Sequence, residues 1–190
     1  MQYLEERIAA QGKVLPGGIL QVGCFLNQQI DPVLLSRIGG EIARLYAGGR
    51  VSKILTIESS GIAIAVAAGL VMNVPVVFAK KHKSSNVDGA FYETPVHSYT
   101  HGTAYNMVVS TEYLRPEDQI LLVDDFLANG EALQGLIRLV NAAGATLVGA
   151  AVAIEKGFQG GGDALRAQGV RVESLAIVEK MDENGIVFRR

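Results

Sequence analysis

The sequence predicts an α/β fold with a central, mainly parallel sheet flanked by helices. Apolar runs of strand length alternate with longer runs of helical spacing, the pattern of a parallel sheet whose crossovers are helices. The short runs are almost continuously apolar, as strands buried on both faces are. An acidic pair, Asp124 and Asp125, directly follows one of them, and sheets of this kind bind ligands at the carboxyl ends of their strands.

The first clearly marked helix begins at Asp31 and Pro32 and runs to about residue 47. Asp31 can cap it, Pro32 suits its first turn, and apolar residues then recur at helical spacing. Further helices are predicted where periodic segments end at glycine or asparagine, at 61–73, 131–143 and 162–168. Strands are predicted over the apolar runs at 51–57, 75–79, 106–110, 119–123, 146–154 and 170–178.

Residues 80–105 interrupt this pattern and show no sustained period. They include Lys80, Lys81, Lys83 and all three histidines of the chain. Long irregular segments in compact domains are typically active-site lids or disordered loops. We therefore expect a flexible loop here, next to the functional site.

Composition limits the classes of protein that remain. The length of 190 residues fits one domain, 1–190, and 49% hydrophobic residues can fill a sizeable core. A net charge of −2 offers no basic excess for holding a long nucleic acid. The single cysteine, Cys24, excludes an internal disulfide framework, and three scattered histidines do not suggest a dedicated metal site. No signal sequence or membrane-length apolar run is present, so a cytoplasmic protein is expected.

The chemistry is expected in residues 120–132. Carboxylates at Asp124 and Asp125 can accept hydrogen bonds from vicinal hydroxyls, and Gly130 allows a tight turn into a helix N-terminus that suits a phosphate. A sugar phosphate would match both. The alternative is an ordinary strand-to-turn junction whose acidic pair caps the next helix. A second anion-capable loop, 58–61, follows another predicted strand and favours the functional interpretation.

This segment resembles the phosphoribosyl-pyrophosphate (PRPP) signature of type I phosphoribosyltransferases. The resemblance covers nearly the whole chain, and the segments 15–32, 58–61 and 178–185 look like the xanthine phosphoribosyltransferases of bacterial purine salvage. It implies the type I fold, with a small hood formed by about residues 1–30 and the C-terminal part. It also implies transfer of phosphoribose from PRPP to xanthine, magnesium as the PRPP chelate, and a homodimer. From the charge and the short apolar runs, no nucleic-acid or membrane partner is expected.

The resemblance also implies roles for individual residues. Asp124 and Asp125 would bind the ribose hydroxyls. The 5′-phosphate would lie on Ala128, Asn129, Gly130, Glu131 and Ala132. Pyrophosphate would lie on the loop Glu58, Ser59, Ser60 and Gly61. Of the three loop lysines, Lys81 is the one expected to contact the pyrophosphate. Xanthine would contact Leu20, Asn27 and Lys156, with Phe158 as a second stacking candidate.

Two departures from the family pattern affect these roles. The loop ends in Asn129-Gly130-Glu131-Ala132 where the usual signature carries hydroxyl residues, and the charge of Glu131 lowers phosphate affinity unless it points away. Ala128 stands where some relatives carry an acid that handles the N7 proton of the purine. Either another group takes that proton or the base enters already deprotonated.

Alternatives to xanthine transfer remain open at this stage. Adenine or another purine could be the acceptor, although Lys156 suits a carbonyl better than an amino group. A PRPP-sensing regulator of purine genes would need a basic face, which the net charge of −2 does not favour. Lys156 could also be a solvated strand-end residue, Asn27 a turn residue, and Leu20 and Phe158 core residues.

Overall fold

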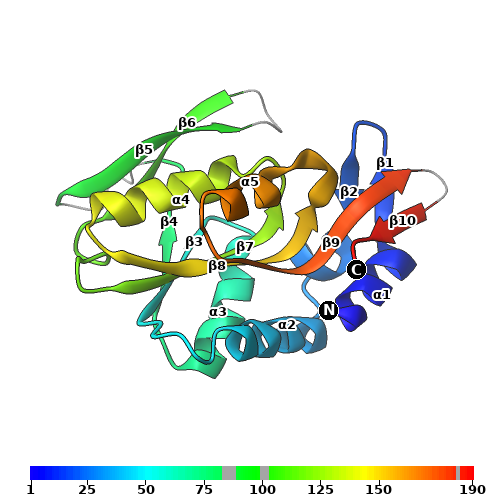
Figure 1. Ribbon diagram of the computed structural model, residues 1–190, viewed down its shortest axis with the longest axis horizontal. Coiled ribbons are helices and arrows are strands. Elements are labelled where there is room, and N and C mark those ends of the chain that lie inside the picture. Colours follow the sequence, from blue (N-terminus) through cyan, green and yellow to red (C-terminus); the bar gives the residue numbers. More distant parts are fainter. Residues whose placement is uncertain (83–88, 99–102, 183–184) are drawn as a thin grey trace.

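The computed structural model describes residues 1–82, 89–98, 103–182 and 185–190. Within these residues the centre is a six-stranded sheet in the order β10-β9-β8-β7-β3-β4 (Figure 1). Neighbouring strands are parallel except for β10, which runs antiparallel to β9. The strands of this sheet are β3 (Lys53–Ile57), β4 (Val76–Ala79), β7 (Gln119–Leu127), β8 (Thr146–Lys156), β9 (Val172–Asp182) and β10 (Gly185–Phe188).

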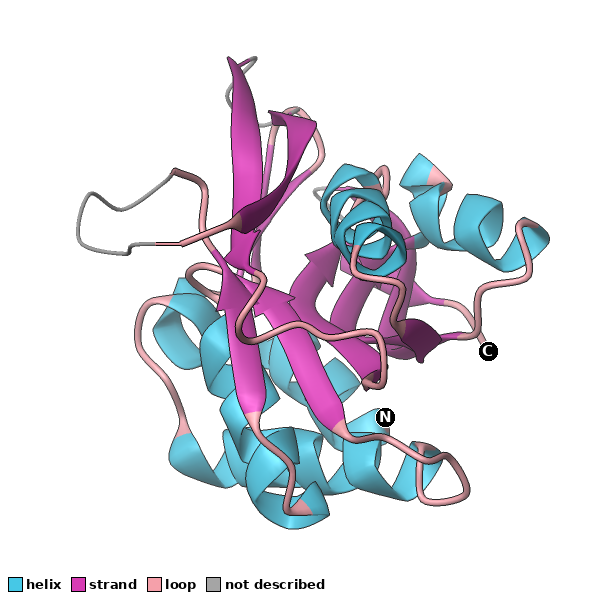
Figure 2. Cartoon of the chain, turned by 90° about the vertical axis from the view of Figure 1, so that its left-hand side faces the viewer, coloured by secondary structure: helices cyan, strands magenta, loops and turns pink. Residues whose placement is uncertain are grey.

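Helices cover both faces of the sheet (Figures 1 and 2). The helices are α1 (Gln2–Gln11), α2 (Pro32–Leu45), α3 (Gly61–Met72), α4 (Glu131–Ala142) and α5 (Gly161–Ala167), with a π-helix η1 (Gly23–Asn27) and a 3-10 turn η2 (Gly157–Gln159). Side chains of β7 alternate between the two layers: Leu121 and Val123 pack with α2 and α3, whereas Ile120 and Leu122 pack with α4. All four are fully buried, which explains the continuous apolar run, and each contributes about 1.5–3 kcal/mol by burial.

The predicted start of the helix at residue 31 is confirmed. Asp31 Oδ1 accepts hydrogen bonds from the backbone N–H groups of Val33 and Leu34, at 2.9 and 3.1 Å. The remaining predicted helices and strands appear within a few residues of their expected ends. The strand expected at 170–178 extends to Asp182 and is not the last, because β10 follows it.

The expectation of one irregular segment over 80–105 is corrected by the structure. Residues Phe91–Ser98 (β5) and Thr103–Ser110 (β6) pair as an antiparallel hairpin, so the strand expected at 106–110 is the end of a longer one. Polar Thr94 is buried and Pro95 lies inside the strand, and both hide the period-2 pattern. Lys83 and His101 lie outside the described residues. Whether the hairpin moves as a lid stays a prediction.

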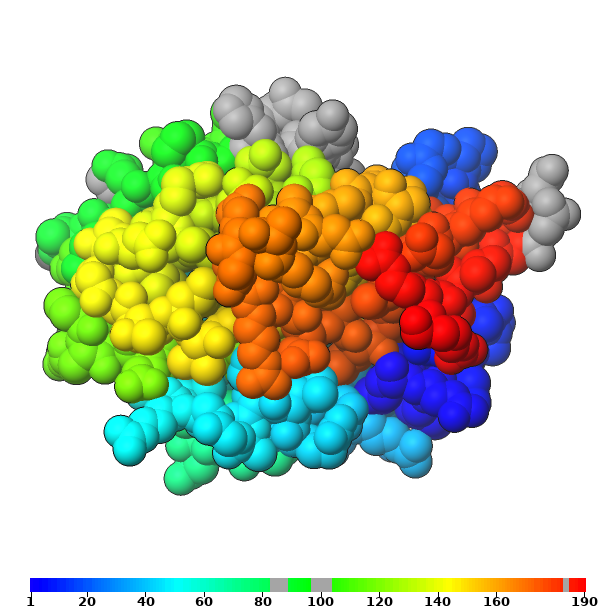
Figure 3. Space-filling view, in the orientation of Figure 1, coloured from blue at the N-terminus to red at the C-terminus, as the bar shows by residue number. Residues whose placement is uncertain are grey.

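Both ends of the chain lie at the β10 edge of the sheet (Figure 3). Arg190 contacts Glu5 of α1 at 3.0 Å. A small hairpin of β1 (Lys13–Leu15) and β2 (Ile19–Gln21) stands beside β9. These segments and η1 occupy the region in which the sequence predicted a hood. Among the described helices, none is long and apolar enough to cross a membrane.

The contact between α2 and α3 yields a stability prediction. A Cβ on Gly39 would lie 2.6 Å from the backbone oxygen of Ala67, whereas a Cβ on Gly40 would meet nothing within 4 Å. Gly39→Ala is expected to lower the free energy of unfolding by about 1–3 kcal/mol, because the helices must separate. Gly40→Ala, the matched control, is expected to raise it by about 0.4–1 kcal/mol. Urea denaturation of both variants checks this, and equal stabilities would contradict it.

Candidate active site

The carboxyl ends of β3 and β7 are neighbours in the sheet, so the loops that follow them meet at one edge. A cavity of about 290 Å³ lies there. It is lined by Ile57, Glu58, Ser60, Lys81, Val96, Tyr105, Asp124, Asp125, Phe126, Leu127, Ala128, Asn129, Gly130, Glu131, Ala132 and Leu133. One cavity therefore holds most of the predicted PRPP site: the acidic pair, the phosphate turn, Glu58 and Ser60 of the pyrophosphate loop, and Lys81.

The acidic pair is held almost out of water. The exposed fractions of Asp124 and Asp125 are 5% and 8%. The backbone N–H of Asp125 donates to Asp124 Oδ1 at 2.9 Å. Burial, together with the negative charge of Asp125, raises the pKa of Asp124 well above its ordinary value, although the Asp125 N–H and the Lys81 charge act in the other direction. A cation or a hydroxyl donor entering the cavity would relieve this unfavourable state.

Gly61 allows the loop after β3 to approach Asp124. A Cβ at Gly61 would lie 2.8 Å from Asp124 Oδ1 and still closer to Thr56 Oγ1. The hydroxyl of Thr56 is buried and has no hydrogen-bond partner in the described structure. The acidic pair is thus packed against the first residue of α3, and that residue has to be glycine.

The predicted pyrophosphate loop faces Lys81. Glu58 Oε1 accepts a hydrogen bond from the backbone N–H of Lys81 at 2.7 Å, and the Glu58–Ser59 peptide bond is cis. The Lys81 ammonium lies 5.8 Å from the ring centroid of Tyr105. This places a cation at the cavity, whereas Lys80 lines a different pocket, beside β4.

The predicted phosphate turn joins β7 to α4. Gly130 has φ = 90°, a left-handed conformation that favours glycine, and Asn129 Oδ1 accepts a hydrogen bond from the N–H of Glu131 at 3.3 Å. Gly130 and the first residues of α4 line the cavity, so the positive end of the helix dipole faces it. Glu131 also lines the cavity, and its charge opposes a phosphate there.

Two of the predicted base contacts lie close to the acidic pair. Asn27 Nδ2 donates to Asp125 Oδ2 at 3.1 Å. Lys156 Nζ donates to the carbonyl of Gly18 at 3.0 Å and lies 5.6 Å from the ring centroid of Phe126. Burial lowers the pKa of Lys156. The lysine is therefore partly withdrawn from water, between the β1–β2 turn and the end of β7.

The other two predicted base contacts differ in exposure. Leu20 is 6% exposed and belongs to the core cluster of α1, α2 and α3. Phe158 is 44% exposed, and its ring edge would meet a Cβ on Gly18 at 3.6 Å. Leu20, Asn27, Lys156 and Phe158 are not among the residues that line the 290 Å³ cavity. Of the four, Asn27 contacts Asp125 and Lys156 lies beside Phe126, at one end of the cavity.

The β5–β6 hairpin contributes two side chains to the cavity that the sequence did not predict. Val96 and Tyr105 line the cavity, and burial, followed by the charge of Asp124, raises the pKa of Tyr105. An alternation of Tyr92, Thr94 and Val96 was the available signal. It was weak because one of its members is polar.

Acceptors for hydroxyls and an anion-binding turn at one strand end of a parallel sheet are what a sugar phosphate requires. The fold and the site therefore define an α/β protein of the type I phosphoribosyltransferase class. The chain belongs to the phosphoribosyl transferase domain family, whose sequence model matches residues 34–184.

Individual relatives are similar over the full length. A protein of Bifidobacterium longum named xanthine phosphoribosyltransferase is 56% identical over 192 residues, covering 100% of both chains. One of Alkaliphilus metalliredigens with the same name is 54% identical, covering 100% of this chain and 94% of the relative. The solved structure of APRTase from Giardia lamblia complexed with 9-deazaadenine has a TM-score of 0.77 at 20% identity, covering 94% and 98% of the two chains. At that identity the structural likeness concerns the fold.

The two kinds of buried aspartate predict opposite responses to pH. In the folded protein the pKa of Asp124 is raised, so the wild type loses stability as the pH rises from the unfolded-state value of about 3.8 through the folded pKa. Asp124→Asn cannot titrate. It is expected to be more stable than the wild type at pH 7, with the difference shrinking toward pH 4.

Asp118 provides the matched control. Burial alone would raise its pKa, but Lys53 at 2.6 Å and the Arg115 N–H at 2.9 Å lower it overall. Its contribution to stability is present above the unfolded pKa and is lost as the pH falls through the folded pKa. Asp118→Asn is therefore expected to be less stable than the wild type at pH 7. Thermal unfolding between pH 4 and 8 measures both variants, and a destabilised Asp124→Asn at pH 7 would refute the assignment.

Proposed function

We propose that this protein transfers the 5-phosphoribosyl group of PRPP to xanthine, giving xanthosine 5′-phosphate and pyrophosphate. The observation that carries the proposal is the buried pair Asp124–Asp125 followed by the Gly130 turn, in one cavity with Lys81. Relatives that are 54–56% identical over the whole chain bear the name of this activity.

The proposed PRPP pose uses each side of the cavity differently. The carboxylates of Asp124 and Asp125 accept hydrogen bonds from the 2- and 3-hydroxyls of the ribose. The N-terminus of α4, entered through Gly130, receives the 5′-phosphate. Lys81 and the 58–61 loop take the pyrophosphate at the opposite end. The ribose is thereby held between two anion sites, which fixes its C1 atom for reaction.

In the proposed transfer, the bond from ribose C1 to the pyrophosphate oxygen breaks and a bond from C1 to a purine nitrogen forms. Positive charge develops on the ribose ring as pyrophosphate leaves. Two buried carboxylates beside that ring stabilise it, because electrostatic interactions are strong where water is excluded. Lys81 neutralises charge on the leaving group.

Magnesium is proposed to enter as the chelate of PRPP. The carboxylates of Asp124 and Asp125, which line the cavity, are hard oxygen ligands of the kind that magnesium prefers. Among the described residues, no cluster of three or more potential metal ligands is present. Two carboxylates fit a metal that is held largely by substrate oxygens and water, and bound magnesium would supply further charge neutralisation to the pyrophosphate.

Xanthine selectivity is proposed to come from Lys156 and Asn27. The lysine donates hydrogen bonds and accepts none, so it suits an exocyclic oxygen of the base. In the structure Lys156 donates a hydrogen bond to the Gly18 carbonyl, and an oxygen of the base would replace or supplement that acceptor. Asn27 offers both a donor and an acceptor to the oxo/NH edge. With Ala128 in the turn, we propose that xanthine binds already deprotonated.

The proposed compartment is the cytoplasm, where charged phosphoribosyl donors are retained. No nucleic-acid or membrane partner is proposed. The net charge of −2 argues against a DNA-binding regulator built on this domain.

Product formation from PRPP and magnesium with four bases tests the proposal. Xanthine is expected to exceed hypoxanthine in kcat/KM by about 10–100-fold, because an unpaired donor costs about 1–3 kcal/mol. Guanine and adenine complete the panel.

Lys156→Gln is expected to lower kcat/KM for xanthine by about 10–100-fold while leaving the affinity for PRPP unchanged. Preference for adenine would overturn the base assignment, and PRPP binding without any turnover would revive the sensor alternative.

We further propose that the protein is a homodimer joined through the apolar surface of α3. Leu70, Val71 and Val66 on this helix are 78%, 58% and 43% exposed. Contiguous exposed apolar side chains of this kind mark interaction surfaces. A second copy of the chain is the proposed occupant.

Sedimentation equilibrium is the measurement for the dimer. The wild type is expected at twice the 20.2 kDa chain mass. Leu70→Glu is expected to be monomeric, because dimerisation would bury an unpaired charge. Val187→Glu alters an exposed residue of β10 and is the control that should remain dimeric. A monomeric wild type at micromolar concentration contradicts the proposal.

A further inference from the structure

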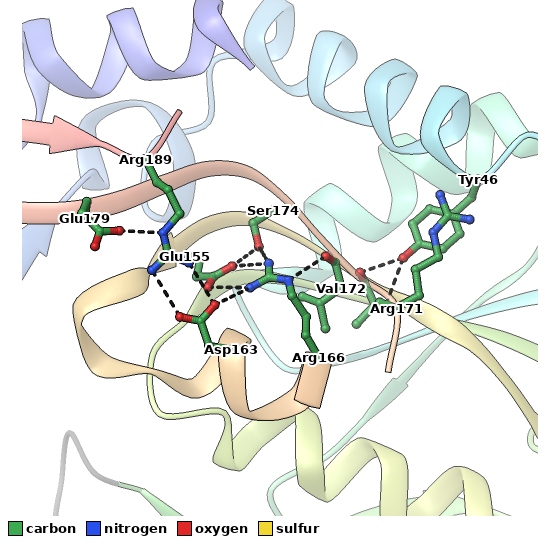
Figure 4. Close-up of polar contacts among 10 residues, drawn as sticks. Tyr46, Glu155, Asp163, Arg166, Arg171, Val172, Ser174, Glu179 and Arg189 are labelled. Atoms are coloured by element: carbon green, nitrogen blue, oxygen red, sulfur yellow. Dashed lines mark hydrogen bonds and ion pairs between the residues drawn. The ribbon is translucent and has the colours of Figure 1, made fainter. Parts of the chain in front are cut away.

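An ion pair with a buried carboxylate lies behind the phosphate turn. Glu155, at the end of β8, is fully buried, and Arg166 of α5 holds it with two hydrogen bonds, Nη1 to Oε1 at 3.0 Å and Nη2 to Oε2 at 2.7 Å (Figure 4). Ser174 of β9 also donates to Glu155 Oε2. Arg166 Nε reaches the carbonyl of Val172 at 3.3 Å. One guanidinium therefore joins α5 to two strands of the sheet.

Two consecutive glycines, Gly161 and Gly162, let the start of α5 pack closely against Glu155 on one side and the phosphate turn on the other. A Cβ on Gly162 would lie 2.8 Å from Glu155 Oε2, so this backbone rests on the carboxylate itself. A Cβ on Gly161 would lie 2.6 Å from the backbone nitrogen of Gly130. The N–H of Gly161 donates to the carbonyl of Ala128 at 3.2 Å. The start of α5 is thus packed between the ion pair and the turn.

Strand pairing also places Glu155 next to the start of the turn. Glu155 pairs with Leu127 across the β7–β8 ladder, and Ala128 begins the turn one residue later. An Arg–carboxylate fork fixes geometry as well as charge, because both of its hydrogen bonds must be aligned. Within the described residues, the turn is fixed from behind by α5, and α5 is fixed by Arg166.

We infer that Arg166 and Glu155 are positioning residues for the turn 128–130, and that they set the affinity for the 5′-phosphate of PRPP. The inference rests on the proposed function for the identity of the ligand. Neither side chain touches the cavity. They act by holding the turn and the N-terminus of α4 in the geometry that an anion requires.

The test uses substitutions in the full chain. Arg166→Met removes the fork, and Arg166→Lys keeps a charge without it. The double variant Glu155→Gln/Arg166→Met also removes the buried charge that the single variant would leave unpaired, and so guards against unfolding. Arg189→Met is the control, because Arg189 also bridges to α5, through Asp163 at 2.9 Å, but its partner carboxylate is 54% exposed whereas Glu155 is 1% exposed, and such an exposed pair contributes little.

The first readout is hydrogen exchange of the amides of residues 127–133 without substrate. We expect exchange at least about tenfold faster than in the wild type for every Arg166 variant, including the double variant after its melting temperature has recovered. Arg189→Met should exchange like the wild type. Wild-type exchange in any folded Arg166 variant overturns the inference, because the pair would then serve stability alone.

The second readout separates the two substrates. The KM for PRPP is expected to rise at least about tenfold in Arg166→Met and in the double variant, and to a smaller extent in Arg166→Lys, while the KM for xanthine changes less than threefold. A KM for PRPP within twofold of the wild type overturns the inference. Failure of the proposed function shows differently: the wild type itself would not turn over xanthine, while faster exchange of the turn would still support the positioning role.

Discussion

Two adjacent carboxylates near the carboxyl end of the central strand β7 are the constraint on which the site depends. Asp124 and Asp125 lie almost out of water, and folding must keep them there although burial and mutual repulsion oppose it. The surrounding sheet makes this possible, since its strands are fixed on both faces by packed apolar side chains. Because the buried negative charge is unfavourable, the site favours ligands that reduce this cost, namely hydroxyl donors and cations.

Close backbone approach is the second requirement, and glycine meets it both at the aspartate pair and at the phosphate turn. Gly61 admits the loop after β3 to Asp124, and Gly161 admits α5 to the phosphate turn. At either position a Cβ would lie within 3 Å of the group it faces. The anion-binding turn is thus positioned by packing from behind, which allows its own residues to be small and open to the ligand.

The end of β8 serves two sides of the site because successive side chains on a strand point in opposite directions. Glu155 turns toward α5 and its arginine, whereas Lys156 turns toward the Gly18 carbonyl and Phe126. Asn27 adds a direct link, because it donates to Asp125. Strands β7 and β8 therefore support both halves of the site. Neighbouring residues at their ends serve the proposed base site on one side and the proposed PRPP site on the other.

The sequence by itself determined the alternation of strands and helices, the cap at Asp31, and the acidic pair with its glycine turn, because these depend on local periodicity and turn chemistry. It did not reveal the β5–β6 hairpin, whose pattern Thr94 and Pro95 obscure, or β10. Nor could it reveal that Asn27 meets Asp125, or that Arg166 meets Glu155. Such contacts join residues that are distant along the chain or separated by a turn, and only the packing of the layers against one another decides which side chains meet.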